Sequence, residues 1–304
     1  MTPPLAARTA GSVSAASRRI GPLGRASGGG VKSLWATGAS LQRHVTSTKS
    51  LFLFLDYDGT LTPIADHPSH ARLQAGTKRL LKQSADLPGV WVALVSGRSL
   101  SDLKRIVGIR GLYYVGNHGL ELEGPSLRYV NPVAQATQPL LTQIAGELKA
   151  ALRPIPGAWV EEKGLTFSVH WRNVPRTLRR TFHQRLRRYT VPLEAEGLIR
   201  LTRGKRVVEA RPPVQWGKGE MVTWILRHLI PRRSSAKPLV MYLGDDETDE
   251  DAFRVANRCR GLSVFVGRRR SATRARWWVR SSREVREVLA RIVEARQWQP
   301  TPPP

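Results

Sequence analysis

The chain has 304 residues, 41% of them hydrophobic, so it is long enough to bury a sizeable core in one large domain or two modest ones. It holds no apolar run of about eighteen residues, which excludes a membrane-spanning helix, and its single cysteine, Cys259, excludes an internal disulfide and a thiolate metal cage. Its formal net charge of +26 comes mostly from arginine and would attract anionic partners over long distances.

Two interpretations of this charge stay open. Arginine-rich chains bind nucleic acids or anionic membranes through phosphate contacts and counterion release. Alternatively, the arginines reflect a coding bias, because they are spread over the whole chain and are not interleaved with aromatic residues that stack on bases. We expect neither a nucleic-acid nor a membrane partner, and a phosphorylated substrate would be attracted by the same field.

The two ends of the chain have unusual compositions. Residues 1–50 are rich in Ala, Ser, Gly and Arg and contain no Asp or Glu, which predicts a disordered basic extension. This segment resembles an organelle transit peptide but lacks a sustained amphipathic period, and a mis-assigned start codon explains it equally well. The single cysteine fits a reducing compartment, so we expect a cytoplasmic protein. Residues 297–304 are predicted to form a disordered tail.

Strand-like and helix-like segments alternate from residue 51 to residue 131. Strands are expected at 51–57, 90–97 and 112–119, and helices at 76–85 and 101–107. This alternation predicts a parallel sheet with both faces covered. Each strand ends in polar residues, and open α/β sheets bind their ligands at the carboxyl ends of the strands.

Residues 132–212 follow a different pattern, which indicates an α+β unit. Helices are expected there at 139–152 and 174–189, and strands at 159–163, 166–171, 198–203 and 206–212. The α/β alternation then resumes over residues 213–296. We therefore expect an α/β fold in which a parallel-sheet core, formed by residues 51–131 and 213–296, carries an inserted α+β cap at 132–212.

The first predicted strand ends in the string DYDGTLTPI. Asp56 and Asp58 stand at i and i+2, so both lie on one side of an extended segment. Neighbouring carboxylates repel one another unless a cation or a proton intervenes, so this spacing calls for a divalent metal or a raised pKa. A solvated turn is the alternative, because Asp and Gly favour turns. The fully apolar strand before the motif argues against that alternative.

A second acidic segment, GDDETDEDAF, follows the apolar strand expected at 238–243. Six acids fall within seven residues of an otherwise basic chain, which favours a hard, oxygen-ligated cation such as Mg²⁺. Favourable acids at a helix N-terminus account for Glu250 and Asp251, but not for the whole cluster.

Two further strings are weaker signals. In SGR, the Ser96 hydroxyl and a nearby backbone amide can hold a phosphoryl oxygen near a helix start. In GKG, Gly217 and Gly219 allow close backbone approach around Lys218, which can neutralise a phosphate or a carboxylate. A lone lysine is more often a solvated surface group.

Taken in order, DxD at the first strand, Ser at the second, a later Lys and an acidic GDD segment resemble the haloacid dehalogenase superfamily. The fuller strings DYDGTLTPI, SGR, GNHG, VEEKG, HWR, VEARP, GKG and GDDETDEDAF resemble the trehalose-6-phosphate phosphatase family over residues 51–292. The resemblance implies a haloacid-dehalogenase-like Rossmannoid core and a small-molecule substrate, trehalose 6-phosphate. We expect the protein to act as a monomer.

The resemblance also implies roles for single residues. Asp56 would attack phosphorus and become an aspartyl phosphate, while Asp58 would protonate the leaving sugar oxygen and then deprotonate water. Ser96 and Lys218 would hold the non-bridging oxygens. Mg²⁺ would bind the Asp56 carboxylate, the Asp58 backbone carbonyl and Asp245, with Asp246 or Asp249 in support.

Substrate binding would extend from the core to the cap. The implied sugar-binding set combines core residues near the mouth of the site with cap residues: Gly97, Arg98, Asn117, His118, Glu161, Lys163, Glu209, His170 and Arg172. Catalysis by His118 is not expected, because an isolated histidine is more often structural.

Two other functions stay open. The first is hydrolysis of another sugar phosphate, such as sucrose phosphate, mannosyl-phosphoglycerate or a hexose phosphate, against which the strings EEKG and EARP argue. The second is nucleic-acid binding by a vestigial phosphatase fold, against which the intact acidic motifs and Lys218 argue.

Overall fold

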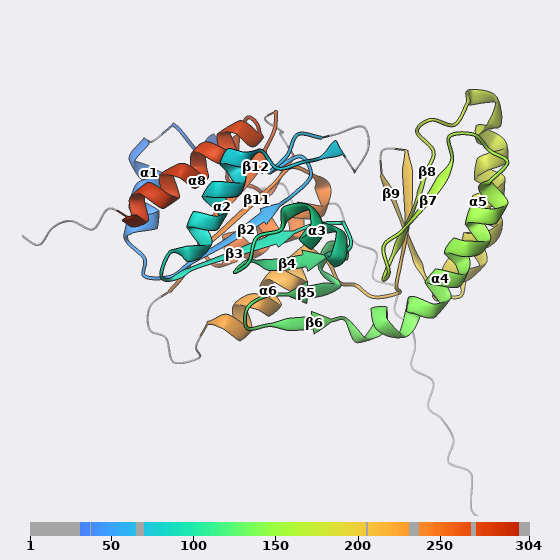
Figure 1. Ribbon diagram of the computed structural model, residues 1–304, viewed down its shortest axis with the longest axis horizontal. Helices are drawn as coiled ribbons and strands as arrows, with labels where there is room; N and C mark the ends of the chain where they lie inside the picture. Colours follow the sequence, from blue (N-terminus) through green and yellow to red (C-terminus); the bar gives the residue numbers. More distant parts are fainter. Residues whose placement is uncertain are drawn as a thin grey trace, which may run out of the picture. The chain divides into compact units, whose positions relative to one another are not determined.

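The computed structural model describes residues 31–36, 38–64, 70–204, 206–230, 237–268 and 272–297. Two β-sheets with their helices organise this part of the chain (Figure 1). The disorder expected for residues 1–30 and 298–304 lies outside the described residues. Within them, no helix is both long and apolar enough to cross a membrane.

The larger sheet has nine strands in the order β1-β13-β12-β11-β2-β3-β4-β5-β6. Neighbours from β1 to β4 run parallel, and β5 and β6 add antiparallel pairs at one edge. The central strands are β11 (Leu239–Gly244), β2 (Leu51–Asp56), β3 (Val90–Val95) and β4 (Tyr113–Gly116). Outside them lie β1 (Lys32–Ser33), β13 (Trp277–Val279), β12 (Leu262–Val266), β5 (Glu121–Glu123) and β6 (Arg128–Val130).

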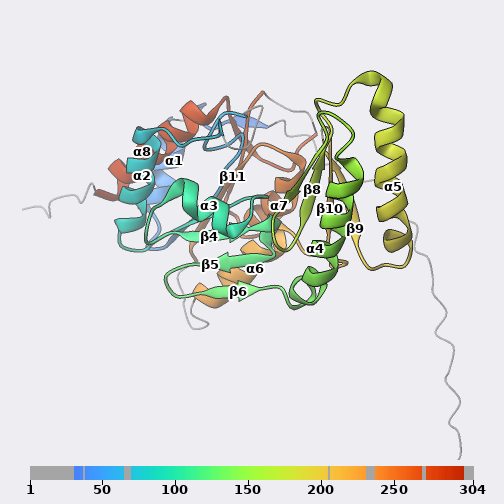
Figure 2. The ribbon, with the colours of Figure 1, turned by 45° about the vertical axis from the view of Figure 1, so that its right-hand side comes forward.

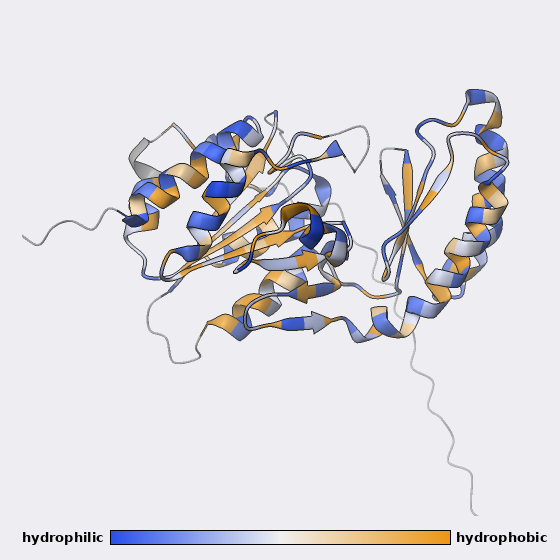
Figure 3. Cartoon of the chain, in the orientation of Figure 1, coloured by the Kyte–Doolittle hydropathy of each residue, from blue (hydrophilic) through white to orange (hydrophobic). Residues whose placement is uncertain are grey.

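Alternate side chains of β2 enter two separate cores, because successive residues of a strand point to opposite faces. Leu53 and Leu55 belong to a core shared with α1, α2, α3 and α8, while Phe52 and Phe54 belong to one shared with α6 and α7. Figure 3 shows apolar strands between helices whose outer faces are polar. These helices are α1 (Gly38–Thr46), α2 (Ala75–Asp86), α3 (Leu100–Val107), α6 (Lys218–Leu229), α7 (Glu250–Arg258) and α8 (Ser282–Gln297).

The expected disorder of residues 1–50 is wrong for the described part of that segment. β1 pairs with β13, and α1 packs on α8 through the buried Leu41 and Val45. The Trp35 indole donates a hydrogen bond to Glu284, 3.0 Å away. The segment is ordered because a few apolar side chains cover the end of the sheet, although its acid-free composition resembles that of a disordered one. The disordered tail was expected to begin at residue 297, but Gln297 is the last residue of α8 and is therefore helical.

The smaller sheet, ordered β7-β8-β10-β9, lies between β6 and α6 in the chain and is covered by two helices (Figures 1 and 2). Its elements are α4 (Pro132–Leu152), β7 (Trp159–Glu162), β8 (Phe167–His170), α5 (Arg179–Ala195), β9 (Arg200–Gly204) and β10 (Val207–Arg211). We call residues 132–211 the inserted unit. α4 begins seven residues earlier than expected, because the Asn131 side chain caps its first amides and Pro132 occupies the first turn.

The strands of the inserted unit have one apolar and one polar face. Val169, Val208 and Ala210 pack towards α4 and α5. The alternate residues on the opposite face include Glu161 and Glu209, so the period of two places both carboxylates away from the helices.

Candidate active site

Asp56 ends β2 and is buried, with 5% of its surface exposed. Its Oδ1 accepts a hydrogen bond from Lys218 Nζ at 2.6 Å. Lys218 is the first residue of α6, whose start is fixed by the Glu220 carboxylate accepting from the Gly217 amide. The GKG string therefore positions a buried ammonium group against the carboxylate at the strand end.

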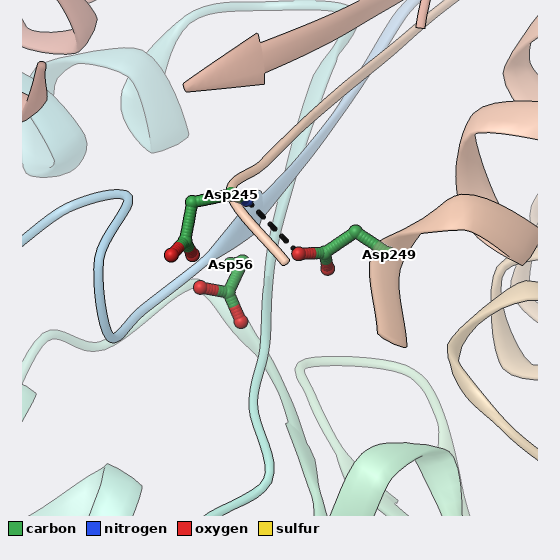
Figure 4. Close-up of side chains that lie close together, drawn as sticks. All are labelled: Asp56, Asp245 and Asp249. Atoms are coloured by element: carbon green, nitrogen blue, oxygen red, sulfur yellow. Dashed lines mark hydrogen bonds between the residues drawn. The ribbon is translucent and has the colours of Figure 1, made fainter. Parts of the chain in front are cut away.

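Asp249 uses both of its oxygens within the protein. Oδ1 accepts from Lys218 Nζ at 2.8 Å and from the Tyr242 hydroxyl at 2.7 Å. Oδ2 accepts from the backbone amides of Asp245 and Asp246 at 3.0 and 3.1 Å, and Figure 4 draws the first of these bonds. Asp249 thus orients Lys218 and fixes the turn that carries Asp245.

The carboxylates of Asp56, Asp245 and Asp249 converge (Figure 4), each offering an oxygen within 4.8 Å of the others. Together with Lys218 they form what we call the carboxylate cluster. Asp56 Oδ2 is buried and has no hydrogen-bond partner among the described residues. Three acids facing one lysine, with one oxygen unsatisfied, are the donors that a hard cation such as Mg²⁺ requires.

Electrostatics point the same way. Burial raises the pKa of Asp56 well above its usual value, against the attraction of Lys218. Burial and the charge of Asp249 together raise the pKa of Asp245 to about 7. A bound cation would offset both effects, because it favours the ionised carboxylates.

The backbone conformation and the surroundings of Gly59 explain why the DYDG string has a glycine at this position. Its φ of +90° lies in the left-handed region, and a Cβ at this position would stand 2.2 Å from Asp245 Oδ2. A larger residue would push the second acidic loop away from Asp56.

Asp58 points elsewhere. Its side chain is 43% exposed, and its two oxygens accept from Arg98 Nη2 and Nε, both at 2.7 Å. The side chains of Asp56 and Asp58 therefore do not share a cation, and the expected metal contact of Asp58 concerned only its backbone carbonyl. Arg98, which was expected to bind the substrate, donates to the carboxylates of Asp58 and Asp102.

Ser96 and Gly97 follow β3. The register pairs Asp56 with Val95, so Ser96 is the next residue beyond the strand neighbour of Asp56, and it is buried. Its hydroxyl accepts from the Arg98 amide at 3.2 Å. Gly97 leaves room for the His118 ring, which a Cβ would meet at 2.5 Å.

A second group of polar residues joins the larger sheet to the inserted unit. Asn117 Nδ2 donates to the Lys163 carbonyl at 2.9 Å, and the Thr166 hydroxyl donates to Asn117 Oδ1 at 2.7 Å. Glu209 accepts from Lys163 Nζ at 3.0 Å and lies 3.3 Å from His118 Nε2. We call Asn117, His118, Lys163, Thr166 and Glu209 the interface cluster.

The charges of the interface cluster are matched. Burial alone would raise the pKa of Glu209, but His118 and Lys163 hold it well below its usual value. Burial lowers the pKa of His118 against the pull of Glu209. Asn117 and His118 have φ values of 46° and 56°, a left-handed backbone that is uncommon outside glycine.

Three of the remaining expected residues lie on the same face of the inserted unit or at its edge. Glu161 and His170 are paired at 2.9 Å, and the His170 ring stacks on Trp159 with 4.0 Å between ring centroids. Arg172 is exposed. Asp246 caps the turn after β11 by accepting from the Thr248 amide.

Several residues escaped the sequence-based expectations. Asp102 stands four residues after Arg98 in the first turn of α3, a spacing typical of a helical ion pair. Tyr242 lies within an apolar strand, so nothing in the sequence indicated that its buried hydroxyl donates a hydrogen bond to Asp249. Thr166 gave no signal, since threonine is ordinary in strands.

The family model for trehalose-phosphatase matches residues 54–282, which is most of the chain. A trehalose-phosphate phosphatase of Mycobacterium tuberculosis is 40% identical over 216 residues, covering 70% of this chain and 53% of the relative. The one of Mycobacterium marinum is 38% identical over 229 residues, covering 73% and 55%. The chain thus spans about half the length of these curated relatives.

Solved structures share the fold. The C-terminal domain of the Candida albicans trehalose-6-phosphate phosphatase aligns with a TM-score of 0.73 at 23% identity, covering 87% of this chain and 99% of that one. A haloacid dehalogenase-like hydrolase from Bacteroides thetaiotaomicron aligns with a TM-score of 0.55 at 16% identity, covering 81% and 100%. The expected fold class is confirmed by these neighbours, and the chain belongs to the trehalose-phosphatase family.

Proposed function

We propose that this protein is a phosphatase that hydrolyses trehalose 6-phosphate through an aspartyl-phosphate intermediate on Asp56. The observation that carries the proposal is the bonding of the Asp56 carboxylate. Its Oδ1 accepts a hydrogen bond from Lys218, whereas its Oδ2, close to Asp245, has no hydrogen-bond partner among the described residues. The names of the family model and of the curated relatives support the substrate.

The reaction divides into two displacements. In the first, an Asp56 oxygen forms a bond to phosphorus, the phosphorus–sugar oxygen bond breaks, and the leaving oxygen takes a proton from Asp58. In the second, a water oxygen attacks phosphorus, Asp58 takes a proton from that water, and the bond between phosphorus and Asp56 breaks. General acid and base action of this kind supplies about 10²–10⁴-fold of rate, and the fixed charges of the site supply much of the rest.

Lys218 is the cation that would stabilise the negative charge of the phosphoryl group during both steps. Its ammonium is buried against Asp56 and Asp249, and their charges raise its pKa despite burial, so it remains a cation. A buried cation costs no reorganisation when the phosphoryl group arrives. Ser96 would add a hydroxyl donor from the end of β3.

The carboxylate cluster fits Mg²⁺, which would bind Asp56, Asp245 and the Asp58 backbone carbonyl, with Asp249 behind them. When bound, the ion screens the nucleophile from the phosphate and stabilises charge on the transferred group. The orphaned Asp56 oxygen and the raised pKa of Asp245 support this assignment.

The inserted unit would act as a cap that recognises the sugar. Glu161, Lys163 and Glu209 offer charged acceptors and donors suited to a hydroxyl-rich ligand. Because Lys163 and Glu209 are already bonded to one another, sugar hydroxyls would exchange with existing bonds. Closure of a cap of this kind excludes water. A monomeric state and a cytoplasmic location remain predictions.

The proposal is tested by measuring phosphate release from trehalose 6-phosphate, sucrose 6-phosphate and glucose 6-phosphate, with Mg²⁺ and with a chelator. We expect the fastest release from trehalose 6-phosphate and none after chelation. Faster release from another sugar phosphate would refute the substrate, and no release from any of them would refute the phosphatase. Salt-dependent retention of nucleic acid without phosphate release would favour the nucleic-acid alternative.

A further inference from the structure

The Asp58 carboxylate is held by a two-pronged contact. Arg98 donates from Nε to Oδ2 and from Nη2 to Oδ1, both at 2.7 Å. Such a fork fixes the plane of the carboxylate as well as its position, which a lysine does not achieve. Each oxygen can accept a second hydrogen bond, so the fork leaves lone pairs available to a water or a leaving group.

Arg98 is itself held from behind. Its Nη1 donates to Asp102 Oδ2 at 2.8 Å, and its guanidinium lies 5.3 Å from the centre of the Tyr57 ring. Only 8% of the Arg98 side chain is exposed, whereas 43% of Asp58 is. The buried member of the Asp58–Arg98 pair is therefore the guanidinium, and the exposed member is the carboxylate of Asp58.

Asp102 is anchored by the helix on which it stands. It lies in the first turn of α3, where its amide donates to the capping hydroxyl of Ser99 and its other oxygen accepts from Arg105. The start of α3 follows directly on the SGR string, so the same loop that carries Ser96 also sets Arg98.

We propose that Asp102 and Arg98 are positioning residues that set the orientation of Asp58, the group that exchanges protons with the leaving oxygen and with water. The inference rests on the proposed function. It reassigns Arg98 from a substrate contact to a group that acts through Asp58, and it gives Asp102 a role in the reaction.

The pair differs from an ordinary surface ion pair of the same spacing. Lys82 and Asp86 are also four residues apart, but both side chains are more than half exposed. Exposed pairs of this kind contribute little to stability. Asp86→Asn is therefore a matched control for Asp102→Asn.

The test compares two substrates, 4-nitrophenyl phosphate and trehalose 6-phosphate. 4-Nitrophenolate leaves phosphorus without being protonated, so its release does not need Asp58. Hydrolysis of the phosphoenzyme that remains does need Asp58, because a water must lose a proton. In Asp102→Asn we expect a rapid burst of about one 4-nitrophenolate per enzyme at the wild-type rate, followed by a steady state slowed roughly tenfold or more. With trehalose 6-phosphate the same variant should show no burst of trehalose and a lower kcat at nearly unchanged KM.

Two further variants sharpen the result. Asp102→Glu keeps a carboxylate and should recover much of the steady-state rate, whereas Arg98→Lys keeps the charge but loses the fork and should behave like Asp102→Asn. Asp86→Asn should match the wild type in both phases. Recovery by Asp102→Glu would distinguish positioning from general damage to the fold.

The inference is overturned if Asp102→Asn keeps the wild-type steady state, or if its burst and steady state fall together. Failure of the proposed substrate looks different, because the wild type would then release 4-nitrophenolate but no trehalose, and the test would still run on the aryl phosphate. If the wild type hydrolyses neither compound, the proposed function is wrong and the inference falls with it.

Discussion

The carboxylate cluster and the interface cluster are both buried and charged, yet they are balanced differently. In the carboxylate cluster three acids face one lysine, and Asp56 Oδ2 has no partner among the described residues. In the interface cluster Glu209 is bonded to Lys163 and faces His118, and Thr166 bridges to Asn117. The first has acidic charge in excess, whereas in the second a single carboxylate faces two basic side chains, and His118 Nδ1 is its one buried side-chain atom without a hydrogen-bond partner among the described residues.

This difference suits the two clusters to different proposed tasks. The carboxylate cluster has an excess of negative charge, which a bound cation would compensate before a phosphoryl group arrives. A balanced cluster can join the inserted unit to the larger sheet before any ligand arrives, because its buried polar atoms, His118 Nδ1 excepted, already have partners among the described residues. Substitutions should therefore affect chemistry most at the first cluster and attachment of the inserted unit most at the second.

Asp56→Asn should have the largest effect. The amide is a poor nucleophile, so we expect phosphate release to fall by about 10³-fold or more. Without metal, the Asp56→Asn variant should nevertheless melt at a higher temperature than the metal-free wild type, because it has lost one of three carboxylates that repel one another. Phosphate assays and thermal melts in a chelator measure both effects.

A matched control for this change lies in the same acidic segment. Asp251 is 55% exposed and pairs with Arg254 at the start of α7, so Asp251→Asn should keep full activity and an unchanged melting temperature. Full activity in Asp56→Asn would instead place the nucleophile elsewhere.

Lys218→Met should have the largest effect on stability. It leaves Asp56 and Asp249 buried without their shared cation, and breaking a buried pair in this way costs about 3–5 kcal/mol. Urea unfolding in a chelator measures the loss. The control Lys82→Met removes an exposed pair and should cost under about 1 kcal/mol. Equal losses in both variants would contradict the view that the carboxylate cluster depends on its lysine.

Much of the carboxylate cluster could be predicted from the sequence, because its acidic motifs stand at the ends of apolar segments that are recognisable as strands. Asp56 is the last residue of β2 and Asp245 directly follows β11, and these two buried strands pair in parallel, so the two carboxylates meet at one edge of the sheet. The Asp58–Arg98 pair could not be predicted this way, because it joins residues 40 positions apart whose side-chain directions depend on two loops. A stretch of local sequence carries no information about such a contact.

The fold shows the same limit. The central strands were expected from their apolar runs, but β1 and α1 were not, because only a few residues such as Leu34 and Leu41 anchor them against distant elements. Tertiary burial decides their order, whereas their local composition resembles that of a disordered segment.

Mg²⁺ should stabilise the protein by a smaller amount than Lys218 does. An ion that binds only the folded state adds about 2.7 kcal/mol at a concentration 100 times its Kd. We expect the melting temperature to rise with Mg²⁺ in the wild type but not in Asp245→Asn, which loses a proposed ligand. Sodium chloride at equal ionic strength is the control, and an equal rise with that salt would contradict a specific site.

Glu209→Gln should have the smallest effect, and the effect should depend on pH. The pKa of Glu209 is held well below 4.5 in the folded protein, so its stabilising contribution is present above that pH and is lost as the pH falls through the lowered value. Buried His118, whose pKa is lowered from 6.5, also favours the folded state more as pH rises, and it remains in the variant. At pH 6.5 we expect the variant to be less stable by about 1–2 kcal/mol, because Lys163 and His118 lose a charged acceptor. This difference should shrink as the pH is lowered below about 4.5. Thermal melts between pH 3.5 and 6.5 measure it, and a difference that stays constant over this range would mean that Glu209 does not complete the interface cluster as an ionised group.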